Sequence, residues 1–261
     1  MDLVLGTLTL RPYVFAFLAL FVAAGSADLG WRRTTLFGVV VWPIAWLAEF
    51  SSTRTGFPFG LYHYTGLTRD RELYVADVPF MDALSFTFLT YASFCLARAV
   101  LVRRAPRRGT LALTAGALMM ALDVVIDPLA VRGDRWFLGR IFYYPEGGAY
   151  FGVPLSNFAG WVIVGALGVA VYLLLAGSVG GPPQAHGAPV AVSALGGRVW
   201  TGVALYYVVL AFNLAVTAWI GEWALLAAGI ALHAAMGATI RYVRGEPGAA
   251  PALPSRGVQQ A

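Results

Sequence analysis

The stretch Ala149-Tyr-Phe-Gly-Val-Pro-Leu-Ser-Asn-Phe-Ala-Gly-Trp-Val-Ile-Val-Gly-Ala-Leu-Gly-Val-Ala-Val-Tyr-Leu-Leu-Leu-Ala176 has no charged residue and is longer than the roughly 20 residues that span a bilayer. Similar uncharged runs cover residues 12–27, 34–48, 83–97, 109–122, 199–221 and 223–240. The 261 residues are 59% hydrophobic and 12% charged, with a mean hydropathy of +0.71. This composition is too apolar for a soluble domain and predicts an all-α, polytopic membrane bundle.

The runs and their flanks predict a single transmembrane domain over residues 1–244 with about seven helices. The helices are expected at about 12–29, 34–50, 81–101, 109–127, 152–176, 198–217 and 221–243. Residues 177–197 are rich in Gly, Pro and Ala and predict a flexible connector. The tail 245–261 has a similar composition and is expected to be disordered.

The charged residues exclude some functions and indicate an orientation. All 18 basic residues are Arg, so the lysine that a retinal protein needs for its Schiff base is missing. The single Cys95 cannot form an intramolecular disulfide. The net charge of +5 lies between apolar spans and does not indicate nucleic-acid binding. The arginine-rich stretch 98–108 predicts an N-terminus outside and a cytoplasmic C-terminus in the cell (inner) membrane.

Two long connections, 50–80 and 127–154, are expected on one face, because every second connection in such a bundle lies on the same side. Of the 13 acidic residues, all but Asp28 and Glu246 lie on or near that face. Solubility does not explain so uneven a distribution, which marks this face as the place for chemistry.

Three acids at helix ends are the candidate catalytic residues: Glu49, Asp123 and Asp127. Asp123 and Asp127 share one helical face, although Pro128 disfavours helical geometry at Asp127. An ionised acid within a span costs about 2.5–3.5 kcal/mol, so such groups usually face a cavity and serve a function. The alternative is that they sit in water or pair with arginines. Asp82 is a further candidate, or a partner of a helix dipole.

The segment Glu49-Phe-Ser-Ser-Thr-Arg-Thr-Gly-Phe-Pro-Phe-Gly-Leu-Tyr-His-Tyr64 predicts a shaped, non-helical element, because Gly and Pro interrupt it. Its aromatic residues, with those near residue 150, fit either an interfacial belt or a lining for a flat polyene and a carbocation; they include Phe57, Phe59, Tyr62, Tyr64, Tyr150 and Phe151. His63 has no histidine at metal-binding spacing, so no metal site is expected. Asn157 either joins two helices or holds water.

Several of these residues fall into motifs that resemble a known family. Glu49, the run Thr55-Gly-Phe-Pro-Phe-Gly-x-Tyr-x-Tyr64, Val78-Pro79, Asp123, Asp127-Pro128 and Tyr150-Phe-Gly-Val-Pro-Leu-Ser-Asn-Phe-Ala-Gly-Trp161 resemble carotenoid biosynthesis membrane proteins. The likeness is to the bisanhydrobacterioruberin hydratase and γ-carotene hydratase type, and it covers about residues 40–175.

The resemblance implies addition of water to a terminal isoprenoid double bond of an acyclic carotenoid, giving a tertiary alcohol without a cofactor. Its partners would be the carotenoid, the lipid bilayer and other enzymes of the pathway. The expected roles are a proton donor at Asp127 or Asp123, with Glu49 orienting water or tuning the donor. In the expected substrate-binding set, Tyr62, Tyr64 and Phe151 line the cation site and Asn157 holds water. Arg54 and His63 hold the acids in place. The set also includes Phe57, Phe59, Asp82, Tyr150 and Trp161.

Two other classes of function stay open. Protonation of an alkene also starts cyclisation, so a carotenoid or prenyl cyclase is one alternative. A membrane transporter or pigment-binding protein is the other, although no inverted repeat is evident. Product mass separates these possibilities, because hydration adds a water whereas cyclisation and binding add nothing.

Overall fold

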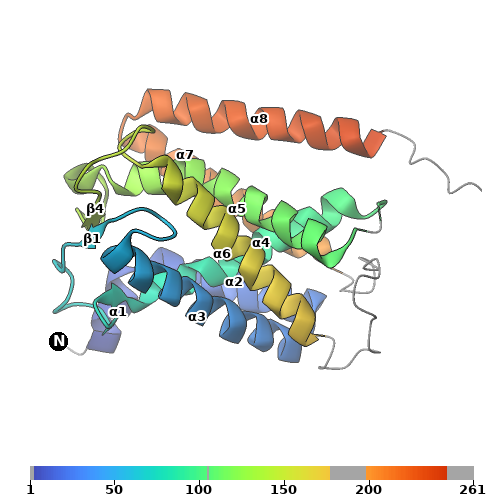
Figure 1. The fold of residues 1–261 in the computed structure, drawn as a ribbon, viewed down its shortest axis with the longest axis horizontal. Helices are drawn as coiled ribbons and strands as arrows, with labels where there is room; N and C mark the ends of the chain where they lie inside the picture. Colours follow the sequence, from blue (N-terminus) through green and yellow to red (C-terminus); the bar gives the residue numbers. More distant parts are fainter. Residues whose placement is uncertain (1–2, 105, 177–197, 246–261) are drawn as a thin grey trace, which may run out of the picture.

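The computed structural model describes residues 3–104, 106–176 and 198–245, and these form a bundle of helices with very little sheet (Figure 1). The helices are α1 Leu3–Leu10, α2 Pro12–Asp28, α3 Trp31–Thr55, α4 Phe80–Leu101, α5 Arg108–Ala130, α6 Leu155–Leu175, α7 Val199–Trp219 and α8 Trp223–Gly245. Six of them, α3 to α8, are long and apolar enough to cross a membrane. The predicted all-α membrane bundle is therefore confirmed.

A bent pair of helices lies where the first of the seven predicted spans was expected. Helices α1 and α2 pass the same test only together, and they meet at an angle of 85°. The bend lies at Arg11, which has non-helical dihedrals and precedes Pro12 at the first position of α2. Proline starts a helix readily but cannot continue one, because it lacks the N–H. The sequence-based helix 12–29 thus begins where expected, but α1 was not predicted.

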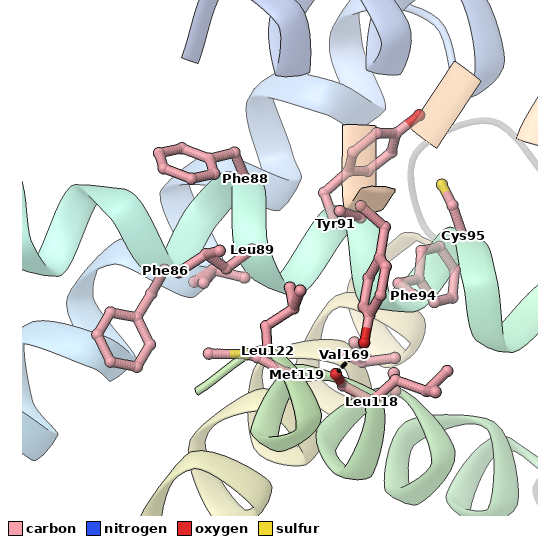
Figure 2. Packing of buried hydrophobic residues seen from close by; sticks show 14 of the residues in the cluster. Phe86, Phe88, Leu89, Tyr91, Phe94, Cys95, Leu118, Met119, Leu122 and Val169 are labelled. Carbon is pink, nitrogen blue, oxygen red and sulfur yellow. Dashed lines mark hydrogen bonds between the residues drawn. The ribbon is translucent and has the colours of Figure 1, made fainter. Parts of the chain in front are cut away.

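Helix α4 is the centre of the bundle: 78% of its apolar 18-residue stretch is buried inside the structure, compared with 17% for α8. Its aromatic and aliphatic side chains pack against α5 and α6, as the labelled Phe94, Met119 and Val169 in Figure 2 illustrate. Helices α5 and α6 approach closely at Gly116, where an added Cβ would lie 2.4 Å from the Val162 carbonyl oxygen. The core therefore depends on small residues at helix contacts as well as on large ones.

A buried ion pair stabilises the end of the bundle where α2 finishes. Arg98 Nη1 on α4 donates to Asp28 Oδ2 on α2 over 2.5 Å, and the Arg198 backbone N–H donates to Asp28 Oδ1 over 3.0 Å. Thr201 Oγ1 on α7 also donates to the Ala24 carbonyl over 3.5 Å. These bonds join α2 to α4 and α7 at this end.

At the opposite end the two long connections lie side by side, as their predicted common face requires. Strand β1 (His63–Tyr64) pairs antiparallel with β4 (Phe142–Tyr143), and Thr65 Oγ1 donates to the Arg140 carbonyl over 2.7 Å. The first connection also holds the hairpin of β2 (Tyr74–Val75) and β3 (Val78–Pro79), and the second holds a 3-10 turn, η1 (Gly133–Arg135). The predicted flexible connector 177–197 and the tail beyond Gly245 lie outside the described residues.

Two local expectations about helix ends are wrong. Helix α3 does not end at Glu49 but continues to Thr55, where Gly56 in a left-handed conformation (φ 81°) terminates it. The non-helical element therefore starts at Gly56. Pro128 does not displace Asp127 either, because α5 continues to Ala130 with the proline inside its last turn.

Candidate active site

A cavity of about 130 Å³ lies at the end of the bundle beneath the paired connections. By this measure a single water needs roughly 10–15 Å³, so the cavity has room for a small branched hydrocarbon group. Its wall combines three acids with many aromatic rings. The lining residues of the expected site are Glu49, Asp82, Asp127, Phe59, Tyr62, Tyr64, Asn157 and Trp161.

The side chains of α5 and α6 form a hydrogen-bonded acid cluster on one wall. Asn157 Nδ2 donates to Asp123 Oδ2 over 2.7 Å and to Asp127 Oδ2 over 2.8 Å. Trp161 Nε1 donates to the same Asp127 oxygen over 3.1 Å. Both pairs are four residues apart, so each helix presents its two groups on one face. Asp127 lines the cavity, whereas Asp123 is fully buried behind Asn157.

The Asp123 carboxylate also bonds the helix backbone next to Pro128. Asp123 Oδ1 accepts the Asp127 backbone N–H over 3.2 Å, which gives that N–H a side-chain acceptor in the turn that the proline disturbs. The acid pair is thereby fixed to the helix backbone as well as to α6.

Glu49 on α3 has a different environment from the acid cluster. Its residue is only 4% exposed, and Oε2 is buried without a hydrogen-bond partner in the described part of the chain. The described ion pairs include none to Glu49. A turn after α3 closes this wall: the Phe59 backbone N–H donates to Ser52 Oγ over 3.0 Å, and the Phe59 ring lines the cavity.

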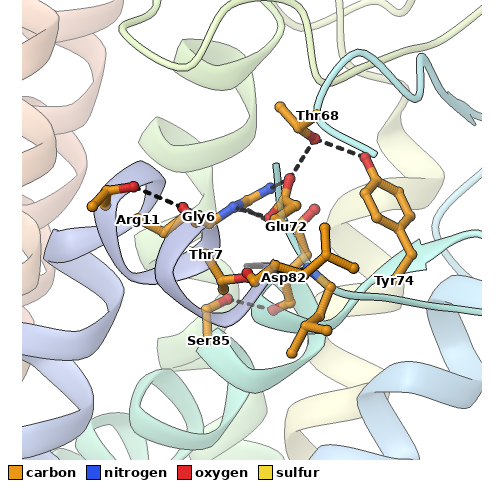
Figure 3. A network of polar contacts seen from close by, with 11 residues as sticks. Gly6, Thr7, Arg11, Thr68, Glu72, Tyr74, Asp82 and Ser85 are labelled. Atoms are coloured by element: carbon orange, nitrogen blue, oxygen red, sulfur yellow. Dashed lines mark hydrogen bonds and ion pairs between the residues drawn. The ribbon is translucent and has the colours of Figure 1, made fainter. Parts of the chain in front are cut away.

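Arg11, at the bend between α1 and α2, is the centre of a buried polar network that Figure 3 shows. Its Nε and Nη2 donate to both Glu72 oxygens over 2.6 and 2.9 Å, and its Nη1 donates to Asp82 Oδ1. Thr68 Oγ1 donates to Glu72 and lies 2.8 Å from the Tyr74 hydroxyl. This network ties the 65–79 connection and α4 to the helix bend.

Aromatic side chains complete the wall. The rings of Phe86 and Trp161 stack with centroids 4.7 Å apart, and Tyr62 contacts Tyr64 and Tyr144 edge to face at 5.4 and 5.7 Å. Burial raises the pKa of the Tyr62 and Tyr64 hydroxyls well above the usual value, and the nearby Glu49 adds to the effect. Both tyrosines are therefore neutral hydrogen-bond donors at ordinary pH.

Five residues of the expected substrate-binding set lie outside the cavity lining. Arg54 pairs with Asp77 over 3.5 Å and lies over the Phe50 ring at 3.7 Å, instead of contacting the three candidate catalytic acids. The other four are an exposed Phe57, a His63 ring beside Tyr143, a Tyr150 packed on Phe158, and a Phe151 whose carbonyl accepts from Arg132.

Sequence reasoning missed several lining residues. Arg11 could have been identified from the sequence, because it is the only charged residue between Leu3 and Ala27. No sequence signal distinguishes the lining residues Tyr13, Phe86 and Phe212, since lipid-facing and cavity-facing rings look alike in an apolar run. Within the described ranges, no group of three or more His, Cys, Asp or Glu side chains is placed to hold a metal ion.

Comparison with known proteins identifies the family of the chain. The sequence profile of the carotenoid biosynthesis protein family matches residues 3–236, nearly all of the described chain. The chain is also 29% identical over 231 residues to the bisanhydrobacterioruberin hydratase of Haloarcula japonica, covering 85% of this chain and 73% of that protein. No solved structure matches the sequence significantly. The family match over this span shows that the chain belongs to the carotenoid biosynthesis protein family.

Proposed function

We propose that this protein adds water to a terminal isoprenoid double bond of an acyclic carotenoid and produces a tertiary alcohol. The observation that carries the proposal is the asymmetry of the cavity's acids. Glu49 is buried with an unpartnered oxygen, whereas Asp127 accepts two N–H donors across an aromatic-lined space. The similarity to a hydratase supports the same reaction class.

Glu49 is the proton donor in this mechanism. An ionised carboxylate without a cation or N–H donor is costly in an apolar wall, so the site accommodates the neutral acid best. Its proton adds to the less substituted carbon of the terminal double bond, and the positive charge develops on the tertiary carbon. This assignment replaces the sequence-based expectation of Asp127 or Asp123 as donor.

The tertiary cation would lie among aromatic rings and carboxylates. Aromatic faces attract cations, and the Phe86–Trp161 stack and the Tyr62–Tyr64 pair provide such faces in the wall. Preorganised charges of opposite sign stabilise a developing cation without reorganisation during the reaction. Carboxylates at Asp82 and Asp127 supply that charge.

Asp127 acts as the base that takes a proton from water while the cation captures the water oxygen. Its Oδ2 is fixed by Asn157 and Trp161, which leaves Oδ1 to accept a proton from a water as the water oxygen bonds to the cation. The proton then returns to Glu49, so each turnover consumes one alkene and one water and changes no oxidation state overall. The sequence-based role of Asn157 in holding water becomes a role in holding the base.

Expression in a lycopene-accumulating bacterium tests the proposal. Hydration adds the mass of one or two waters to the pigment, and growth in H₂¹⁸O places the heavy oxygen in the new hydroxyl. Incubation of isolated membranes with unlabelled lycopene in D₂O places one carbon-bound deuterium beside each new tertiary carbon. A pigment of unchanged mass but altered absorption would indicate cyclisation instead, and a fully unchanged pigment would overturn the proposal.

A further inference from the structure

The proposed function, on which this inference rests, requires an acyclic carotenoid, and the cavity is too small to hold the whole molecule. Sites that enclose a drug-sized ligand measure about 300–1,000 Å³. The volume of about 130 Å³ therefore holds one end of the substrate, and the polyene has to leave through one of the walls.

Three walls of the cavity are closed by polar bonds. The α5–α6 wall is joined by Asn157 to both aspartates, and the connections above the cavity are joined by the β1–β4 pairing. The wall at the α1–α2 bend is closed by Arg11 with Glu72 and Asp82. Opening any of these would break hydrogen bonds or a buried ion pair.

The wall between α2 and α7 is different, because apolar rings close it. Tyr13 of α2 stacks on Phe212 of α7 with centroids 5.6 Å apart, and Phe17 meets Phe212 edge to face at 5.5 Å. Phe137 lies against Tyr13 at 5.3 Å and is 41% exposed. Over the described chain, no hydrogen bond or ion pair joins residues 12–20 of α2 to α7.

Among the described residues, polar bonds join the same two helices at their far ends. There, the Arg198 backbone N–H donates to Asp28, and Thr201 donates to the Ala24 carbonyl. The ion pair of Asp28 with Arg98 anchors that end to α4. Between α2 and α7, separation of the cavity-side halves therefore breaks ring contacts, with the polar end as the pivot.

We propose that the seam formed by Tyr13, Phe17, Phe137 and Phe212 is the binding site of the polyene tail. Tyr13, Phe17 and Phe212 line the cavity, so the seam continues directly from the site of the reacting end. A flat conjugated chain stacks between aromatic rings, and the half-buried Phe212 and exposed Phe137 lead it to the outer surface of the bundle. The seam selects a long, linear, apolar substrate.

A reversible tether across the seam tests this inference. Tyr13→Cys and Phe212→Cys are combined in a Cys95→Ser background and bridged with a short bis-methanethiosulfonate. The matched control carries Ala24→Cys and Thr201→Cys, which bridges the same helices at the fixed end. Both proteins are assayed before bridging, after bridging and after reduction, for hydration of an acyclic carotenoid and for carotenoid that co-purifies.

The tether across the seam should lower hydration by about tenfold or more and release the bound pigment, and reduction should restore both. The control tether should change neither. Equal turnover and pigment retention with the seam bridged would overturn the inference. If no form hydrates the carotenoid but the seam tether alone still releases pigment, the proposed reaction fails while the polyene site stands.

Discussion

Replacement of Glu49 by glutamine should separate catalysis from stability. The amide keeps the shape of the side chain but cannot donate the proton, and general acid catalysis is worth about 10²–10⁴ in rate. At 1.36 kcal/mol per tenfold, the barrier rises by about 3–5 kcal/mol. Because the described structure gives Glu49 no ion pair and leaves Oε2 unpartnered, the substitution removes no buried charge pair. The free energy of unfolding should therefore change by less than about 1 kcal/mol.

The matched variant is Asp82→Asn, which makes the same chemical change on another wall of the cavity. It removes a partner of the buried Arg11, and breaking a buried pair costs about 3–5 kcal/mol of stability. Pigment hydration is measured in isolated membranes by mass spectrometry, and thermal unfolding is measured in detergent. Full hydration by Glu49→Gln would refute the donor assignment. A large loss of stability in that variant would show instead that the carboxyl is structural.

The remaining predictions concern the fixed base, the buried cation and the tyrosines. Asn157→Leu leaves two carboxylates without their shared amide, so stability should fall by about 1–3 kcal/mol in thermal unfolding and hydration should fall with it. Arg11→Met should cost about 3–5 kcal/mol, whereas neutralising its two acid partners in the same protein should recover most of that loss. Because burial raises the pKa of Tyr62 and Tyr64, the stability present below pH ~10 should be lost above it, as unfolded tyrosines ionise first; chemical denaturation against pH, with Phe variants as controls, measures the loss.

The parts of the site that sequence predicted are those governed by local periodicity. Spacing of four residues placed Asp123 and Asp127 on one helical face, and in the structure both accept hydrogen bonds from Asn157, which the sequence offered as a residue joining two helices or holding water. Alternation of connections between two sides predicted that connections 50–80 and 127–154 share one face, and the pairing of strands β1 and β4 agrees with it. These inferences needed only helix geometry and chain parity.

Contacts between distant segments could not be predicted in the same way. Arg11 and Glu72 are 61 positions apart, and nothing local specifies that one guanidinium serves two acids. Arg54 was expected to hold the catalytic acids, but it follows Glu49 by more than one helical turn and reaches Asp77 at the exposed edge. Long charged side chains near a helix end can turn towards water, so their partners depend on the tertiary fold.

Under the proposed function, the charges around the cavity favour the cation over the alkene from which it forms. Three acids line the wall, and Arg11 is the only basic residue that does so within the described chain. That guanidinium is already shared between Asp82 and the buried Glu72, so it leaves no positive charge for a bound anion. The surplus is negative, and the aromatic faces add to it without carrying a formal charge. An uncharged hydrocarbon end gains little from this field, whereas a tertiary cation at the same place gains much, which is the differential stabilisation that catalysis requires.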